Sequence, residues 1–355
     1  MINLKGIFKC LTNTLRLAII SQLLFAPLGY ADPEKPNIVI MLADDLGWAD
    51  VGYHGSDIKT PSIDRLSNEG MRLERFYVNP ICTPTRASLL TGRDALVMGV
   101  GYFPILAWSN KAVPQNEIFM SEILKQSGYQ TGMVGKWHLG HTLESHTPNA
   151  NGFDDFFGHL HTQVFYYSHQ TSGGHDLQHN GKSVTRDEKY LTNVHAEEAV
   201  RFITDRDKEK PFFLYVPFLA PHSPMEAPKD LITKYRNRPL IGMPRENPLH
   251  NTFPVNHLKR TQQVYAAMVD SMDQAIGRIL DALDDEGIAN NTIVLFLSDN
   301  GGFYGFGADN RPLRGEKMTV FEGGIRVPAV IRWGEKISKA SINHQVLSVM
   351  DLLPT

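Results

Sequence analysis

The stretch Cys82-Thr83-Pro84-Thr85-Arg86, which continues as Ala-Ser-Leu-Leu-Thr-Gly to Arg93, decides how the rest of this sequence is interpreted. The chain has two cysteines, and the other one, Cys10, lies within the first 31 residues. Without those residues, Cys82 has no partner for an internal disulfide bond. A lone cysteine is more often a small buried hydrophobic residue than a reactive one. The neighbouring proline and arginine, ahead of a run typical of a helix, indicate instead that Cys82 has a chemical use.

The first 31 residues are predicted to be a secretory signal peptide that is cleaved near Ala31. They carry basic residues but no acidic one, and an apolar run extends from Leu17 to Leu28. The alternative is an uncleaved anchor, but polar residues and a proline interrupt the run, which is short for a stable membrane span. We therefore expect a secreted or periplasmic protein with its catalytic domain at residues 32–355.

The charge of the chain excludes one large class of partners. Its formal net charge is −3, with 35 basic and 38 acidic residues. No basic run with interleaved aromatic residues occurs, so the sequence gives no sign of a nucleic-acid-binding surface.

Apolar, β-branched runs alternate with amphipathic runs along the sequence, which predicts an α/β fold with buried strands. Two stretches, His138–Asp187 and Ala220–Asn256, have the composition of long loops, which are usually functional. The Gly323-Gly324 pair predicts a tight turn into the last strand. Strands are expected over Asn37–Leu42, Gln130–Val134, Phe212–Pro217, Thr292–Ser298 and Val327–Trp333. Helices are expected from Thr60-Pro61, with a threonine N-cap, and over Pro84–Thr91, Phe119–Gln126, Val194–Arg206 and His257–Asp284.

Polar side chains follow four of the expected strands. Asp44-Asp45 comes after the first, Lys136 and His138 after the second, His222 after the third and Asp299-Asn300 after the fourth. Because open α/β sheets bind ligands beyond the carboxyl ends of their strands, we expect these side chains to meet at one edge of the sheet. Strand alternation predicts that Lys136 and His138 lie on the same side.

Asp44-Asp45 and Asp299-Asn300 are the strongest candidates for metal ligands. A single Asp-Asp pair is more often a solvated turn, but both of these pairs follow an apolar run and precede glycine. Three carboxylates and an amide, without paired histidines or cysteines, suit a hard cation such as Ca²⁺ or Mg²⁺ rather than zinc.

Several motifs together resemble the type I, formylglycine-dependent sulfatases. They are Cys-x-Pro-x-Arg at Cys82, Gly-Lys-Trp-His-Leu-Gly at Gly135, Ala-Asp-Asp before Leu46 and Ser-Asp-Asn-Gly at Ser298. The resemblance begins near Asn37 and continues to the end of the chain. The segments Tyr53-His54-Gly55-Ser56 and Tyr166-Tyr167-Ser168-His169 are similar to the N-acetylgalactosamine-4-sulfatase (arylsulfatase B) branch. It implies an alkaline-phosphatase-like three-layer sandwich, in which helices flank a mostly parallel mixed sheet.

The resemblance also implies roles for individual residues. In this family the cysteine is oxidised to formylglycine by a maturation enzyme. The implied calcium ligands are Asp44, Asp45, Asp299 and Asn300, with modified Cys82 completing the shell. The implied catalytic residues are Cys82 as nucleophile, Arg86 holding the modified residue, Lys136 and His222 binding sulfate, His138 as the base for sulfate elimination and Lys317 neutralising the leaving oxygen.

A bare thiol at position 82 is a poor nucleophile for a sulfate ester, because S-sulfation leaves a product with no easy exit. One hydroxyl of hydrated formylglycine attacks sulfur and expels the alcohol. The second hydroxyl then loses its proton, so that the aldehyde re-forms and sulfate leaves. Cys82 lies just ahead of Pro84 at an expected helix start, where free N–H groups and the positive end of the helix dipole favour an anionic transition state.

The expected function is a divalent-cation-dependent sulfuric ester hydrolase that acts on sulfated carbohydrates or aryl sulfates. Two alternatives stay open: a phosphonate or phosphate ester hydrolase with the same nucleophile, and an inactive glycan-binding relative. The run Met350–Thr355 is similar to a helix start from which family members continue into a small C-terminal domain. The chain is therefore expected either to be a fragment or to lack that domain.

Overall fold

The buried strands predicted from apolar runs lie side by side in one sheet of a computed structural model, which describes residues 35–241 and 254–355. Both the predicted signal peptide and part of the second loop-rich stretch lie outside these ranges. The sheet has ten strands in the order β13-β2-β12-β11-β1-β10-β4-β5-β8-β9. Its strands are β1 (Asn37–Ala43), β2 (Met71–Leu73), β4 (Gln130–Lys136), β5 (Asp155–His159), β8 (Gln178–His179), β9 (Lys182–Ser183), β10 (Phe212–Pro217), β11 (Thr292–Ser298), β12 (Ala329–Trp333) and β13 (Ser341–Asn343).

The centre of the sheet is parallel and its flanks are mixed. Strands β11, β1, β10, β4 and β5 run parallel to one another, whereas β12 and β8 pair antiparallel on either side. Central strands that are buried on both faces read as continuous apolar runs, which is why they are recognisable in the sequence. Short pairs outside the sheet are β3 (Phe76–Tyr77) with β14 (Leu347–Ser348) and β6 (Gln170–Thr171) with β7 (Gly174–His175).

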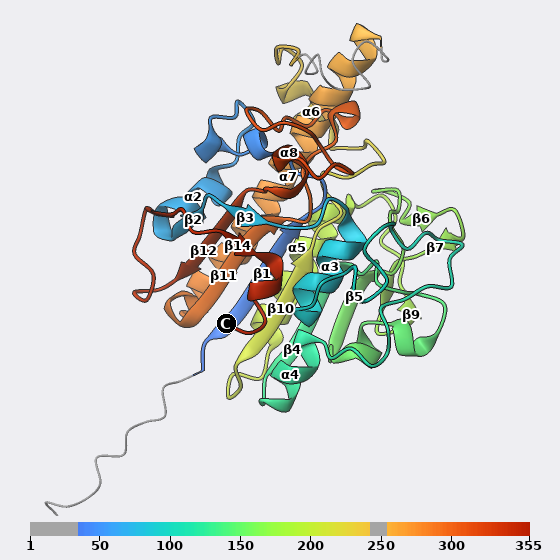
Figure 1. Ribbon diagram of the computed structural model, residues 1–355, viewed down its shortest axis with the longest axis vertical. Coiled ribbons are helices and arrows are strands. Elements are labelled where there is room, and N and C mark those ends of the chain that lie inside the picture. The colour runs from blue at the N-terminus through green and yellow to red at the C-terminus, as the bar shows by residue number, and fades with distance from the viewer. Residues whose placement is uncertain (1–34, 242–253) are drawn as a thin grey trace, which may run out of the picture. The chain divides into compact units, whose positions relative to one another are not determined.

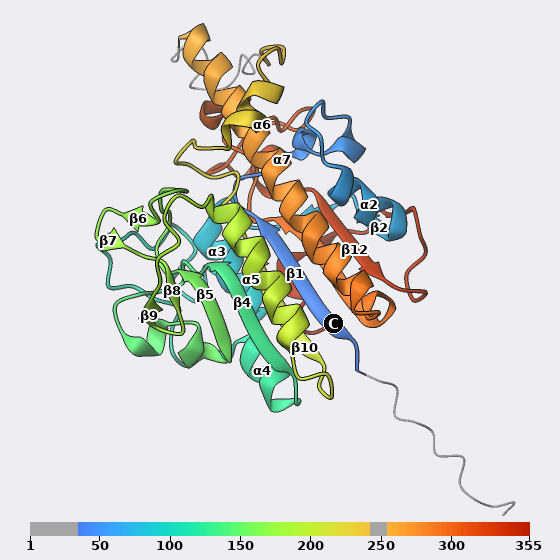
Figure 2. The same cartoon turned by 180° about the vertical axis from the view of Figure 1, so that it is seen from behind.

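Helices cover both faces of the sheet and bury two apolar clusters. On one face, α3 and α4 pack over Ile40 and Leu42 of β1 (Figure 1). On the other, α5 and α7 pack over Val39 and Met41 (Figure 2). The three-layer α/β prediction is thus confirmed. The helices are α2 (Pro61–Glu69), α3 (Cys82–Thr91), α4 (Met120–Gln126), α5 (Leu191–Asp205), α6 (Lys229–Lys234), α7 (Val255–Asp285) and α8 (Glu322–Ile325).

One sequence prediction about local structure was incomplete and another was wrong. The stretch His138–Asp187 is not only loop, because it contains the buried strand β5, whose sequence Asp-Phe-Phe-Gly-His lacks β-branched residues. The Gly323-Gly324 pair lies in the short helix α8 rather than in a hairpin turn. A Cβ on Gly323 would lie 2.3 Å from the carbonyl oxygen of Gly315, and one on Gly324 would lie 2.0 Å from that of Thr319, so close backbone approach, not turn geometry, requires glycine at both positions.

The N-terminus of α2 is capped by a residue from another helix. Thr60 occupies the N-cap position, as predicted, but its side chain accepts a hydrogen bond from the backbone N–H of Gly52 instead of capping. The carboxylate of Asp273, on α7, accepts hydrogen bonds from the backbone N–H groups of Ser62 and Ile63 at 3.0 and 2.8 Å. These are the unpaired donors of the first helical turn.

We predict that Asp273→Ala lowers the free energy of unfolding by about 1–3 kcal/mol, because two buried N–H groups lose their acceptor. Urea denaturation measures this change. Asp285→Ala, at an exposed position of the same helix, is the matched control. Equal losses in both variants would contradict a capping role for Asp273.

Among the described residues, no helix combines the length and the hydropathy that a membrane crossing requires.

Candidate active site

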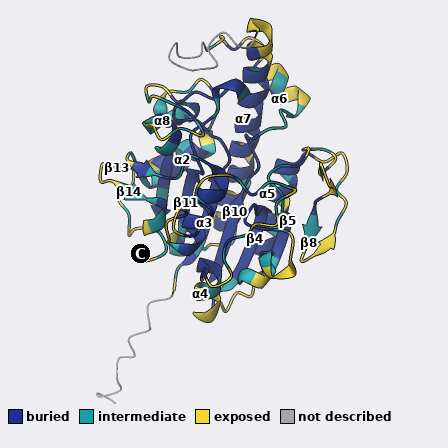
Figure 3. Ribbon diagram, turned by 45° about the vertical axis from the view of Figure 1, so that its right-hand side comes forward, coloured by how far each residue is buried: buried dark blue, intermediate teal, exposed yellow. Residues whose placement is uncertain are grey.

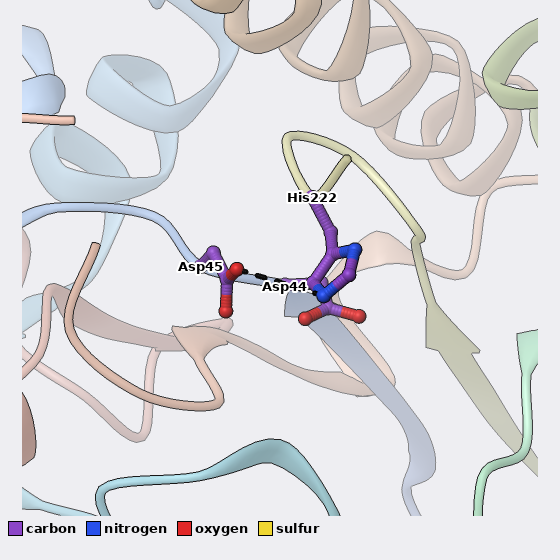
Figure 4. A group of neighbouring side chains, drawn as sticks. All are labelled: Asp44, Asp45 and His222. Atoms are coloured by element: carbon purple, nitrogen blue, oxygen red, sulfur yellow. Dashed lines mark ion pairs between the residues drawn. The ribbon is translucent and has the colours of Figure 1, made fainter. Parts of the chain in front are cut away.

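The two aspartates that follow β1 point in different directions. Asp44 comes directly after the last residue of the strand, and its N–H donates to the carbonyl oxygen of Ala220 at 3.1 Å. Asp45 has a left-handed backbone with φ of 69°. Figure 4 shows the result: the Asp44 carboxylate lies beside the ring of His222, while that of Asp45 projects to the other side. One strand end therefore supplies acidic groups to two parts of the same site.

Arg86 connects the ends of three central strands. Its guanidinium group is fully buried and donates to Asp299 through Nε and Nη2 at 3.1 and 2.9 Å. It also donates to Asp44 at 3.2 Å and to the carbonyl oxygen of Lys136 at 2.9 Å. In this structure Arg86 thus holds the acidic groups around residue 82, and among the described residues no hydrogen bond joins it to Cys82 itself.

The donor set of the site fits a hard cation. Single ligand atoms of Asp44, Cys82 and Asp299 lie within 4.8 Å of one another, and all three residues are buried. Oδ1 of Asp44 and Oδ1 of Asn300 are buried without a hydrogen-bond partner among the described residues. Buried oxygens of this kind cost free energy unless a partner satisfies them, and a divalent cation bound by carboxylate and amide oxygens would do so.

The pKa values of the carboxylates point the same way. Burial and the negative charge of Asp44 raise the pKa of Asp299 to about 7. Burial opposes ionisation of Asp44 too, but the positive charges of Lys136 and Arg86 hold its pKa below the ordinary range. The protein groups alone therefore do not keep every carboxylate charged at neutral pH, whereas a bound cation would displace the proton from Asp299.

Lys136 and His138 lie together, but not through strand alternation. β4 ends at Lys136, whose buried ammonium group donates to Asp44 at 2.5 Å. His138 lies beyond the strand with a left-handed φ of 60°, so strand alternation does not set the direction of its side chain.

The hydrogen bonds of His138 fix its tautomer. Nε2 lies 3.0 Å from the carbonyl oxygen of Ile105, which only accepts, so Nε2 carries the proton. Nδ1 is buried without a partner among the described residues. Burial and the charge of Lys136 hold the pKa of His138 well below its ordinary value. The ring is therefore neutral and presents a free lone pair, as a general base requires.

His222 has the opposite tautomer. Its Nδ1 lies 2.7 Å from the carbonyl oxygen of Ser223, and its Nε2 lies 3.7 Å from Oδ2 of Asp45. Burial and the charge of Lys317 lower the pKa of His222 to about 4. Since Nδ1 holds the proton, Nε2 of His222 and Oδ2 of Asp45 are both acceptors, and they face each other at 3.7 Å. A donor or a cation between them would complete this contact.

Lys317 forms an ion pair with Asp45, the second aspartate after β1. Its Nζ lies 2.6 Å from Oδ1 of Asp45. The same oxygen atom also accepts a hydrogen bond from the side-chain amide of Asn300 at 2.7 Å. Burial lowers the pKa of Lys317, but the negative charge of Asp45 outweighs this and holds it above the ordinary value. Lys317 is therefore a charged ammonium group at neutral pH.

Cys82 is the first residue of α3 and is only 2% exposed. The helix was predicted to begin near Pro84 and begins two residues earlier. Burial raises the pKa of the Cys82 thiol. An unmodified thiol here stays protonated at neutral pH and is a poor nucleophile.

The supports of the site were not visible in the sequence. Oγ1 of Thr83 donates to the carbonyl oxygen of His138 and accepts from the N–H of Ile105, both at 3.1 Å. The hydroxyl of Tyr166 donates to the carbonyl oxygen of His222 at 2.8 Å. Each of these contacts has a backbone atom as one partner, and every residue has the same backbone atoms, so the sequence does not show which one is used. Only the position of Thr83 next to Cys82 suggested that it belongs to the site.

The chain is similar in sequence to known sulfatases. The family model described as Sulfatase matches residues 36–355. Arylsulfatase J of Mus musculus is 36% identical over 334 residues, and N-acetylgalactosamine-6-sulfatase of Rattus norvegicus is 34% identical over 356 residues. Both alignments cover 92% of this chain, but 53% and 62% of the respective relatives. The chain thus spans a little over half the length of these curated relatives.

Solved structures agree in fold. A crystal structure of Ps i-CgsB in complex with k-i-k-neocarrahexaose has a TM-score of 0.80 and 35% identity, covering 90% of this chain and 71% of that one. The PsFucS1 sulfatase from Pseudoalteromonas sp. has a TM-score of 0.71 and 28% identity, covering 90% and 66%.

Proposed function

The chain belongs to the sulfatase family, and from that membership we propose that it hydrolyses sulfate esters of carbohydrates, with residue 82 as the nucleophile. Oxidised to formylglycine and hydrated, residue 82 would supply a hydroxyl group that attacks sulfur. The observation that carries the proposal is the meeting of Cys82, Asp44 and Asp299 within 4.8 Å in a buried site.

We assign substrate binding to Lys136 and His222, which lie in the same site as Lys317. Lys136 would donate to a sulfate oxygen, and the bound anion would raise the pKa of His222 so that its Nε2 becomes protonated and also donates. Arg86 would hold Asp44 and Asp299 in place. Preorganised donors of this kind stabilise the charge that develops on the sulfuryl oxygens.

Proton transfer is assigned to two groups with opposite properties. Lys317, which stays charged because of Asp45, would protonate or neutralise the departing alkoxide. His138 would accept a proton at Nδ1 from the remaining hydroxyl of residue 82, since its Nε2 proton is held by Ile105. The proposed acid, Lys317, and the proposed base, His138, thus lie on different loops. Lys317 is charged and can only give a proton, whereas His138 is neutral at Nδ1 and can accept one.

The metal that we propose is Ca²⁺, with Mg²⁺ as the alternative, bound by Asp44, Asp45, Asp299 and Asn300 together with modified residue 82. A divalent cation supplies polarisation of the sulfuryl oxygens and of the attacking hydroxyl group. The unpaired oxygens of Asp44 and Asn300 support this assignment.

We predict that adding Ca²⁺ to chelator-treated protein raises the melting temperature, since a ligand at 100 times its Kd adds about 2.7 kcal/mol of stability. Differential scanning calorimetry measures this without any substrate. The effect should be strongly reduced in Asp44→Asn, which keeps the side-chain shape, and retained in Asp281→Asn. A melting temperature that does not respond to Ca²⁺ or Mg²⁺ would argue against a resident cation.

The sulfated carbohydrate substrate is proposed by analogy with the relatives named above, with aryl sulfates as simpler substrates. We further propose that the protein is exported to the periplasm or secreted, and that a formylglycine-generating enzyme of the producing cell is its maturation partner. The predicted signal peptide supports export, and the protonated thiol of Cys82 supports a need for oxidation.

Sulfate release from a panel of substrates tests the proposal. The panel contains 4-methylumbelliferyl sulfate, carrageenan oligosaccharides and chondroitin sulfate oligosaccharides, with the corresponding phosphate ester as comparison. Protein produced with a maturation enzyme, and shown by mass spectrometry to carry the aldehyde, should release sulfate. Faster hydrolysis of the phosphate ester would favour the phosphoesterase alternative. Glycan binding without turnover would favour the inactive relative.

A further inference from the structure

An irregular segment between α3 and α4 exposes large aromatic side chains. Tyr102, Phe103 and Trp108 are 74%, 76% and 80% exposed. Single exposed apolar residues are ordinary, but neighbouring ones that together line a hollow are characteristic of binding surfaces. This segment, residues 99–111, is called the aromatic segment below.

The backbone of the aromatic segment is joined to the catalytic groups. The N–H of Ile105 donates to Oγ1 of Thr83, and its carbonyl oxygen holds Nε2 of His138. Two residues further on, the carbonyl oxygen of Ala107 lies 3.1 Å from Nε2 of His141. The exposed aromatic rings therefore flank a stretch of backbone that contacts a neighbour of Cys82 and the proposed base.

A second segment with exposed apolar side chains is joined to the chain just before Cys82. Met318 and Val320, directly after Lys317, are 68% and 76% exposed. The N–H of Met318 donates to the carbonyl oxygen of Pro80 at 2.8 Å. Apolar side chains are thus presented by two segments whose backbones are anchored within two residues of Cys82, one before it and one after it.

The aromatic segment also borders a cavity. Its volume is about 470 Å³, and it is lined by Tyr102, Phe103, Ile105, Trp108, Ser109 and Lys111. This volume lies within the range of small-molecule sites, which are mainly apolar with a few polar groups that set orientation. Here Ser109 and the cationic Lys111 are such groups.

We propose that the aromatic segment binds a pyranose ring adjacent to the sulfated one, so that the substrate is a chain of sugars and not a single sulfated sugar. The inference rests on the proposed function and adds a subsite to it. The axial C–H groups of a pyranose ring form an apolar face that packs flat on an aromatic ring, and the ring hydroxyls stay exposed to water. Lys111 is complementary to a further sulfate on such a chain, and the continuity with His138 favours substrate over an unrelated partner.

Trp108 provides a direct readout of binding. The chain has four tryptophans, of which Trp48 and Trp137 are 7% and 1% exposed and Trp333 is partly buried. Acrylamide quenching of tryptophan fluorescence therefore reports mainly on Trp108. In the Cys82→Ala full-length chain, a carrageenan or chondroitin sulfate hexasaccharide should reduce quenching, whereas the corresponding disaccharide should protect less. Trp108→Phe should lose the protectable signal.

Kinetics on matured protein separate the subsite from catalysis. The quantity is the ratio of kcat/KM for the hexasaccharide to kcat/KM for the disaccharide of the same glycan. Trp108→Ala should lower this ratio about tenfold, mainly through KM, since removing a central aromatic contact has effects of this size. Trp108→Phe should largely restore it. Ile342→Ala, at an exposed apolar position on β13, is the matched control and should leave the ratio unchanged.

The outcomes distinguish the two proposals. Sulfate release with an unchanged ratio in Trp108→Ala overturns the subsite and leaves the proposed function intact. Loss of all sulfate release in wild-type, aldehyde-containing protein overturns the function. Equal protection of Trp108 by hexasaccharide and disaccharide, no protection by either glycan, or protection by self-association at high protein concentration without sugar overturns the sugar-chain inference.

Discussion

Cys82→Ala is expected to abolish sulfate release, with a fall in kcat of at least about 10⁴-fold, the scale on which removal of a covalent nucleophile acts in other hydrolases. The methyl side chain of alanine cannot be oxidised to an aldehyde. Thermal stability should change little, because a small buried side chain is replaced by a slightly smaller one at the first position of α3. The measurements are sulfate release by ion chromatography, aldehyde content by hydrazide labelling and melting temperature.

The control for this result is wild-type protein made without a maturation enzyme. It keeps the thiol, whose pKa burial raises, and should be as inactive as the alanine variant. Turnover by aldehyde-free wild-type protein would show that the thiol itself reacts, and would remove the oxidation step from the proposed function.

Lys317→Ala is the second change with a large expected effect. It should lower kcat about 10²–10⁴-fold, as expected for loss of a general acid, while the aldehyde at residue 82 is still formed. The loss should depend on the leaving group. An aryl sulfate with an acidic phenol needs little protonation, so its hydrolysis should suffer much less than that of a sugar sulfate.

Two variants separate the roles of this lysine. Lys317→Arg keeps the positive charge beside Asp45 but is a far weaker acid, so it should retain the stability of the site and lose most of the rate on sugar sulfates. Lys339→Ala, at an exposed position, is the matched control. Equal losses on aryl and sugar sulfates in Lys317→Ala would assign Lys317 to substrate binding instead.

The central sheet and the place of the site could be predicted from sequence because both depend on strong local signals. β10 and β11 have the predicted bounds, and β1 and β4 differ only at their carboxyl ends. Parallel strands bring their carboxyl ends to one edge, so Asp44, His138 and Asp299 meet although they are far apart in the chain. The roles assigned to them stay proposals.

The remaining features depend on contacts that a pattern of residue types does not encode. β5 lacks the β-branched composition of its neighbours and is held as a strand by pairing with β4. The cap of α2 comes from Asp273, more than 200 residues later in the chain. The tautomers of His138 and His222 are set by backbone carbonyl groups, whose position only the folded chain determines.

The complete burial of α3 restricts when residue 82 can be altered. All ten residues of this helix are buried, as the dark blue of Figure 3 shows, and Cys82 at its start is 2% exposed. An oxidising enzyme needs the side chain and some neighbouring backbone in its own active site, and the helix sits between the sheet and the segments packed over it. The oxidation that we propose for residue 82 would therefore come before folding, while the chain is still extended. Each molecule would then have a single opportunity to become active, and a correctly folded protein that missed it would need to unfold to gain another.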